Sequence, residues 1–244
     1  MSRQPIKNQF YRSMRSLSLK KSWTLWEGWV AVMAIAELIG LGIVVIAATL
    51  IHSLGTESSV TVLHLVGLLE GIILGVAQWL VLHRYIKRIN AWVIVTAIAV
   101  MIVWLIGIKI SALMVFSITL DTTLTPAMQA KALLKGVALL GAWVGGVLGF
   151  AQWFVLKSHI HRAAMWIVAN ALAWALGLAV AFTMVNRIHS ARFNLETALA
   201  GIATGLTTGA VVGAITGITL IWLLRPRLLR RDQNPQEIDH DESL

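Results

Sequence analysis

The chain has 244 residues, of which 58% are apolar and 13% are charged, and its formal net charge is +9. Soluble domains are about half apolar and about a quarter charged, so this composition leaves too little polar surface to cover a water-soluble globule. The sequence has 0 cysteines, which excludes disulfides, thiol nucleophiles and cysteine-based metal sites. The basic residues stand between apolar runs and form no continuous patch, so nucleic acid is not an expected partner.

Six apolar stretches predict transmembrane helices. A helix that crosses the hydrocarbon layer of about 30 Å needs about 20 mostly apolar residues. These runs are apolar on every side, and a helix satisfies its own backbone in lipid. The first run is too long for a cleavable signal peptide and is expected to remain as an anchor. The predicted fold class is therefore an all-α polytopic membrane helix bundle, with spans at Trp29–Ile51, Val60–Leu82, Ala91–Ile108, Ala132–Leu156, Met165–Val185 and Ala198–Leu224.

The basic residues predict the orientation of the spans. Fifteen of the 20 Lys and Arg side chains fall in the two tails and in the loops after the second and fourth spans. Cytoplasmic loops carry such an excess, so both termini are expected in the cytoplasm. Residues 1–28 form a basic segment that either lies on the membrane as an amphipathic helix or is disordered. Residues 29–224 form the membrane domain, and residues 225–244 are predicted to be a disordered tail that follows a helix ended by Pro226.

The spans form an internal repeat of two helices, with copies at residues 29–82, 91–156 and 165–224. Each odd span opens with a tryptophan (Trp29, Trp92 and Trp166) and continues with alanines in register. Because each unit holds two spans, the three copies are predicted to be parallel repeats. The even spans carry glycines at every fourth position, and these are Gly67, Gly71, Gly75, Gly141, Gly145, Gly149, Gly209, Gly213 and Gly217.

These glycine ladders predict close helix packing. Residues four apart share one helix face, and a row of glycines lets another backbone approach. Two uses stay open: packing against the other helix of the same repeat, or docking of a partner protein. Gln78 and Gln152 continue two of the ladders and are expected to point into the bundle, as polar links between helices or as ligand contacts. Thr125 followed by Pro126 predicts the start of the fourth helix.

The pattern G-x-x-x-G-x-x-Q-W-x-V-L occurs at Gly71–Leu82 and at Gly145–Leu156. Followed by a basic loop and a tryptophan-led alanine helix, it resembles a loose group of uncharacterised multipass membrane proteins of cyanobacteria and similar bacteria. The third copy departs from the pattern, because Leu220 stands where the others have glutamine. The resemblance covers residues 60–225 and implies a type of fold, without an activity.

Three ionisable residues within the spans are candidate functional residues, since such groups are costly in lipid. Glu37 and Glu70 occur in the first repeat alone and are expected to meet at mid-depth, and His64 is expected on the same face as Glu70 and the ladder glycines. The pair suits a protonated packing contact, a proton or cation relay, or a contact to a cofactor such as a pigment, with His64 as an axial ligand in the last case. His83, His159 and His161 lie in loops and give a weak metal signal, so no metal site is predicted and the cofactor stays unknown.

Two functions follow from these features. The first is a structural or assembly protein that packs with itself or with a larger membrane complex through its glycine-ladder helices. The alternative is a small ion- or proton-coupled transporter that uses the intramembrane glutamates. No catalytic motif is present, so an enzyme is not expected. The expected location is a bacterial inner membrane or a thylakoid membrane, with the lipid bilayer and a membrane-protein partner or a second copy as partners.

Overall fold

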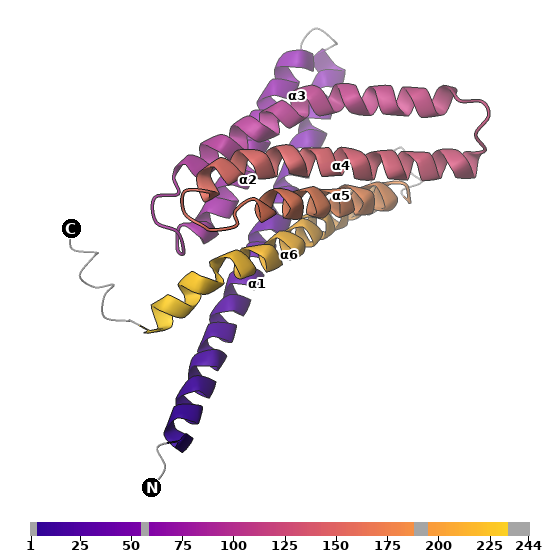
Figure 1. Ribbon diagram of the computed structural model, residues 1–244. Helices are drawn as coiled ribbons and strands as arrows, with labels where there is room; N and C mark the ends of the chain where they lie inside the picture. The colour runs from indigo at the N-terminus through magenta and orange to yellow at the C-terminus, as the bar shows by residue number, and fades with distance from the viewer. Residues whose placement is uncertain (1–3, 55–58, 188–194, 234–244) are drawn as a thin grey trace.

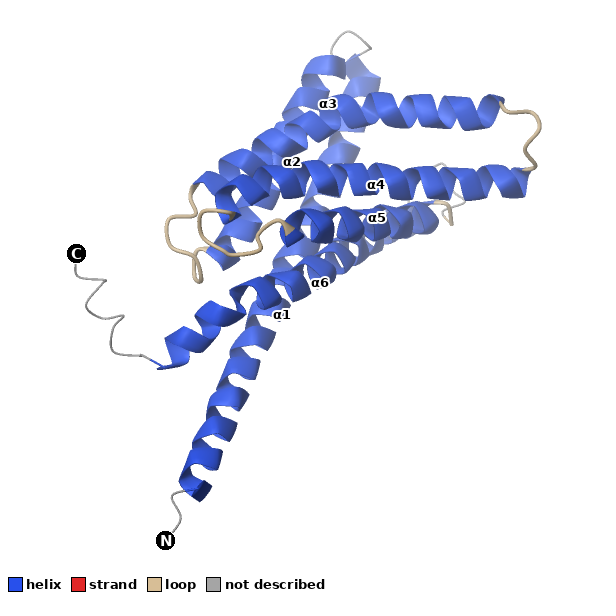
Figure 2. Ribbon diagram, in the orientation of Figure 1, coloured by secondary structure: helices blue, strands red, loops and turns tan. Residues whose placement is uncertain are grey.

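The computed structural model describes residues 4–54, 59–187 and 195–233. This part of the chain is all-α and forms six helices without a strand (Figure 2). All six are long and apolar enough to cross a membrane, as an integral membrane protein requires. The helices are α1 (Gln4–Leu54), α2 (Ser59–Leu82), α3 (Ala91–Leu120), α4 (Pro126–Leu156), α5 (Met165–Val185) and α6 (Leu195–Gln233).

The third and fourth helices extend beyond the predicted spans. α3 continues to Leu120 and α4 begins at Pro126, so the two project together as a hairpin from one end of the bundle (Figure 1). The predicted start of α4 is confirmed, because Pro126 occupies the first turn and the Thr125 side chain accepts a hydrogen bond from the Met128 N–H. In the connecting turn, Asp121 accepts hydrogen bonds from the backbone and the hydroxyl group of Thr123.

One prediction about the tails is wrong, and of the two alternatives for the N-terminal segment the structure favours the helix. Residues 4–21 are helical and continuous with the first span, so this part of the N-terminal segment is not disordered. Pro226 does not end the last helix, since α6 continues to Gln233. Proline removes one backbone hydrogen bond, but the leucines and arginines around it favour a helix and the neighbouring turns continue. Residues 234–244 of the predicted tail lie outside the described residues.

The helices form a closed bundle in which α6 returns to pack against α1. The loops at residues 83–90 and 157–164 lie at one end of the bundle (Figure 2), and the α3–α4 turn lies at the other. We call the first of these the loop end. Large apolar side chains such as Ile94, Leu139 and Ile218 are more than 60% exposed on different helices, as expected for a surface that faces lipid.

Candidate functional site

The glycine ladder of α4 lies directly against α5. A Cβ added to Gly145 would lie 2.5 Å from the Asn170 carbonyl carbon and 2.9 Å from the Ala171 Cα. An ordinary contact needs 3.4 Å or more, so the two backbones touch where the side chain is missing. One turn further, a Cβ at Gly149 would lie 2.8 Å from the Ile167 Cα. The ladder therefore forms a contact inside the chain.

The other two ladders make the same kind of contact. A Cβ at Gly71 of α2 would lie 2.6 Å from the Ala97 Cα on α3, and a Cβ at Gly209 of α6 would lie 2.6 Å from the Ala34 Cα on α1. The expectation that each ladder meets the other helix of its own repeat is wrong. Each even helix packs its ladder against the next odd helix, and α6 packs against α1, where alanines such as Ala97 and Ala34 admit the close approach. A Cβ added to any of the nine ladder glycines would meet atoms of the adjacent helix within 4 Å. Those of α2 (Gly67, Gly71 and Gly75) meet α3, those of α4 (Gly141, Gly145 and Gly149) meet α5, and those of α6 (Gly209, Gly213 and Gly217) meet α1.

Three tryptophans fill the core towards the loop end. Trp29, Trp92 and Trp166 open the odd spans, and each is 0% exposed. The Trp166 ring lies 5.9 Å from the Trp29 ring in an edge-to-face arrangement and 6.0 Å from the Trp92 ring. Indole rings at these distances attract one another beyond the gain from their burial. The three side chains join α1, α3 and α5.

The two glutamines bind these tryptophans. Trp92 Nε1 donates to Gln78 Oε1 at 2.9 Å, and Trp166 Nε1 donates to Gln152 Oε1 at 2.8 Å. Gln152 Nε2 donates to Gln78 Oε1 at 2.8 Å and to Thr96 Oγ1 at 3.1 Å. Both amides are buried, so each bond satisfies a polar atom that has no access to water. Gln78 Nε2 also donates to Met33 Sδ on α1 at 3.4 Å. The structure thus places Gln78 and Gln152 inside the bundle, where they link five helices.

The third tryptophan finds a different partner. Trp29 Nε1 donates to Thr216 Oγ1 at 2.9 Å, and this hydroxyl donates in turn to the Val212 carbonyl group at 2.7 Å. Leu220 stands at the glutamine position of this copy and is fully buried as an apolar side chain. Thr216 lies one helical turn away on the same face and supplies the acceptor. Sequence reasoning missed this residue because it compared single positions, whereas a helix face offers neighbours four residues apart.

The structure brings Glu37 and Glu70 together between α1, α2 and α3. Their carboxyl groups interact electrostatically. The Glu70 carboxyl group packs against α1, where a Cβ at Gly40 would lie 3.3 Å from its Oε1 atom, and it accepts a short hydrogen bond from Trp104 Nε1. Trp104 was not predicted as a partner, because no sequence motif links it to Glu70. In the described residues, neither carboxyl group forms an ion pair with a basic side chain.

His64 is exposed on α2 and is not placed with the glutamates. It lies six residues before Glu70, which is about 240° around the helix, so the expected face shared with Glu70 is wrong. It lies seven residues before Gly71, within about 20° of two full turns, so it does share the face of the ladder glycines. Among the described residues, no group of three His, Cys, Asp or Glu side chains is arranged to hold a metal.

Comparison of the chain with protein-family models, with curated proteins and with solved structures finds no match. The resemblance carried by the Q-W motif therefore stays a prediction.

Proposed function

We propose that the chain is a non-enzymatic integral membrane protein with a structural or assembly role, which packs with a second copy or with other subunits of a membrane complex. We place it in a bacterial inner membrane or thylakoid membrane, with both termini in the cytoplasm. The observation that carries this proposal is that the ladder glycines and the buried glutamines contact other parts of the same chain. Such internal use suits a rigid scaffold.

The tryptophan–glutamine cluster supports this proposal. The centre of the bundle towards the loop end is filled by Trp29, Trp92 and Trp166. The indole N–H groups of all three donate to partners on neighbouring helices. Filled polar cores of this kind stabilise one arrangement of helices and leave few polar groups for a substrate. The same donor and acceptor roles recur three times around the bundle, which supports an internal repeat. A partner would then bind surfaces other than the ladders.

A flux assay tests the proposal directly. The purified chain is placed in liposomes, and proton and monovalent cation fluxes are compared with those of empty vesicles. We expect equal fluxes, together with an assembly larger than one chain on native gels in mild detergent. Flux above the empty vesicles that Glu37→Gln or Glu70→Gln removes would contradict the structural role.

The glutamate pair supports a second candidate, a small ion- or proton-coupled transporter. Two neighbouring carboxyl groups between helices provide the oxygen atoms that binding of a proton or a cation within a membrane requires. The Trp104 N–H stabilises one carboxyl group at a fixed position. The flux assay separates the two candidates, with Glu27→Gln as a matched control because Glu27 is exposed near the loop end of α1.

A further inference from the structure

Aromatic side chains hold basic groups at the rim of the loop end. Lys157 Nζ lies 4.8 Å from the centre of the Trp153 ring and 4.3 Å from the Phe154 ring. The Arg162 guanidinium lies 5.7 Å from the Trp222 ring. A cation over an indole face is attracted by the ring and is held in one place. Trp222 is 43% exposed, so this pair lies on the outer surface of the bundle.

Two arginines in the loops adopt an unusual backbone conformation. Arg88 has a φ of 59° and Arg162 has a φ of 62°, and no other non-glycine residue of the described chain has a positive φ. Arg88 lies six residues after Leu82, the last residue of α2, and Arg162 lies six residues after Leu156, the last residue of α4. Glycine or asparagine adopts this conformation more easily than arginine. An arginine at both places therefore indicates that the side chain has a use that offsets the backbone cost.

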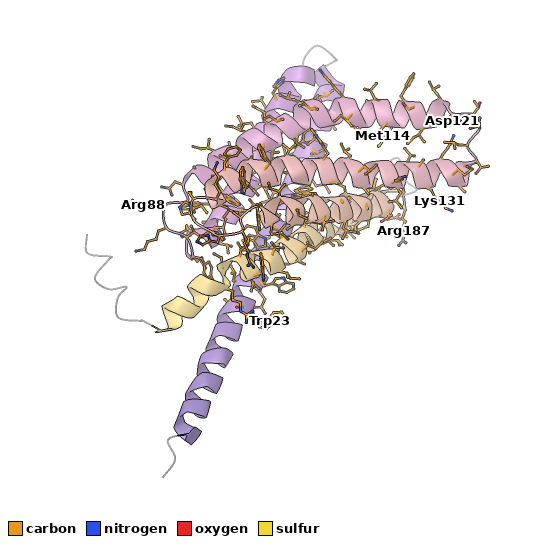
Figure 3. All side chains as sticks on the ribbon, in the orientation of Figure 1. Trp23, Arg88, Met114, Asp121, Lys131 and Arg187 are labelled. Carbon is orange, nitrogen blue, oxygen red and sulfur yellow. The ribbon has the colours of Figure 1, made fainter. Side chains whose placement is uncertain are left out.

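The two arginines are exposed in the loops at the loop end of the bundle. Figure 3 shows Arg88 at the loop end, opposite the end that carries Asp121 and Lys131. Each loop has an isoleucine that is buried against the helices, Ile86 in the first loop and Ile160 in the second. These side chains fix the loops to the bundle. The arginines are thereby held at the level where tryptophan rings and lipid headgroups meet.

We propose that Arg88 and Arg162 form two headgroup sites for anionic phospholipids at the loop end of the bundle. A guanidinium binds phosphate through two parallel N–H groups, which an ammonium cannot do. The Trp222 ring beside Arg162 provides an apolar surface for the glycerol and upper acyl region, which a free phosphate does not need. The ligand class is therefore an anionic phospholipid rather than a soluble anion.

Native mass spectrometry of the detergent-solubilised full chain tests this proposal. The chain is titrated with phosphatidylglycerol, with phosphatidylcholine as the neutral lipid, and with glycerol phosphate as the soluble headgroup. The variants are Arg88→Gly, Arg162→Gly and the double variant, because glycine keeps the positive φ while it removes the side chain. The matched control is Arg187→Gly, an exposed arginine at the opposite end.

We expect the wild type to bind phosphatidylglycerol more tightly than phosphatidylcholine. Each loop variant should weaken phosphatidylglycerol binding about five-fold, the value for one basic residue near an anionic surface. Binding of phosphatidylcholine and the behaviour of the control variant should not change. The thermal midpoint in neutral detergent should not fall, because glycine adopts the positive φ at a lower cost than arginine. Equal binding of the two lipids, a preference that survives in the double variant, or equally tight binding of glycerol phosphate would overturn the proposal. A fall in the thermal midpoint that accompanies lost binding would also overturn it, since it would assign the arginines to folding.

Discussion

A single methyl group placed in the α4 ladder should destabilise the protein, whereas the same group on the next residue should not. The two substitutions are Gly145→Ala and Gly146→Ala. A Cβ at Gly145 would lie 2.5 Å from the Asn170 carbonyl carbon, whereas a Cβ at Gly146 would meet nothing within 4 Å. The two glycines share a helix, a depth in the membrane and a helix propensity, so each is a control for the other.

The magnitude follows from the overlap. The contact of the added Cβ with the Asn170 carbonyl carbon is 0.9 Å shorter than an ordinary one of 3.4 Å, and the Asn170 carbonyl oxygen would lie closer still. These are backbone atoms that cannot rotate away. Overpacking of this kind costs about 3 kcal/mol at the upper end of its usual range. Replacing a helical glycine with alanine returns about 1 kcal/mol, so Gly145→Ala should lose about 2 kcal/mol. Gly146→Ala should gain up to about 1 kcal/mol for the same reason.

Unfolding in mixed micelles measures both values. The two variants and the wild type are unfolded by increasing the fraction of denaturing detergent, and the free energies of unfolding are compared. A difference of about 3 kcal/mol between the variants supports the packing described above. Equal stabilities would show that α4 and α5 do not touch at Gly145, and the reasoning from the glycine ladders would fail.

Three further predictions concern polar groups. Gln152→Leu should destabilise the chain by about 2 kcal/mol, because it leaves a buried N–H group unpaired and breaks two further bonds, and the emission of the core tryptophans should change with it. The free energy of unfolding of Glu70→Gln should stay within about 0.5 kcal/mol of the wild type, because an amide oxygen still accepts from Trp104. Glu70→Leu should lose about 1 kcal/mol, because it removes the acceptor. Equal losses for the two variants in micelle unfolding would contradict this hydrogen bond. The hydroxyl and backbone N–H groups of Thr123 lower the pKa of Asp121 below its usual 3.8, so this contribution to stability is present above 3.8 and is lost as the pH falls through the lowered value. A carboxyl NMR titration should find that Thr123→Val moves the pKa back up, and an unchanged pKa would count against the hydrogen bonds.

Much of the fold follows from local sequence, because a helix in lipid must satisfy its own backbone. The apolar runs predicted the spans, and Pro126 predicted the start of α4. Gly145 and the alanines predicted the helix faces of small residues that pack closely. The choice of partner helix could not be predicted, because a ladder has neighbours on both sides in the sequence. Gly209 meets Ala34, which lies 175 residues earlier, and this contact depends on how the whole bundle closes.

The polar cluster shows a similar limit. The sequence indicated that Gln78 and Gln152 point inwards, since both continue a ladder. Their tryptophan partners were missed, although Trp92 and Trp166 are separated by the same 74 residues as the two glutamines. That shared offset is the signal that predicts the pairs. Thr216 has no such signal in the sequence. It accepts the hydrogen bond from Trp29 at a position one helical turn before Leu220, which occupies the glutamine position of this copy.

Closure of the bundle by α6 against α1 is the central claim, and a crosslink tests it most directly. Gly205 faces Leu38, and the same antiparallel register places Gly201 opposite Gly42 one turn further, where both glycines have open space for a side chain. Because the chain has 0 cysteines, Gly42→Cys with Gly201→Cys gives one defined thiol pair. A short bifunctional thiol reagent should join the pair within one chain and should leave the control pair of Gly42→Cys and Gly146→Cys unlinked. Absence of the first crosslink, or links between chains alone, would contradict the closed bundle.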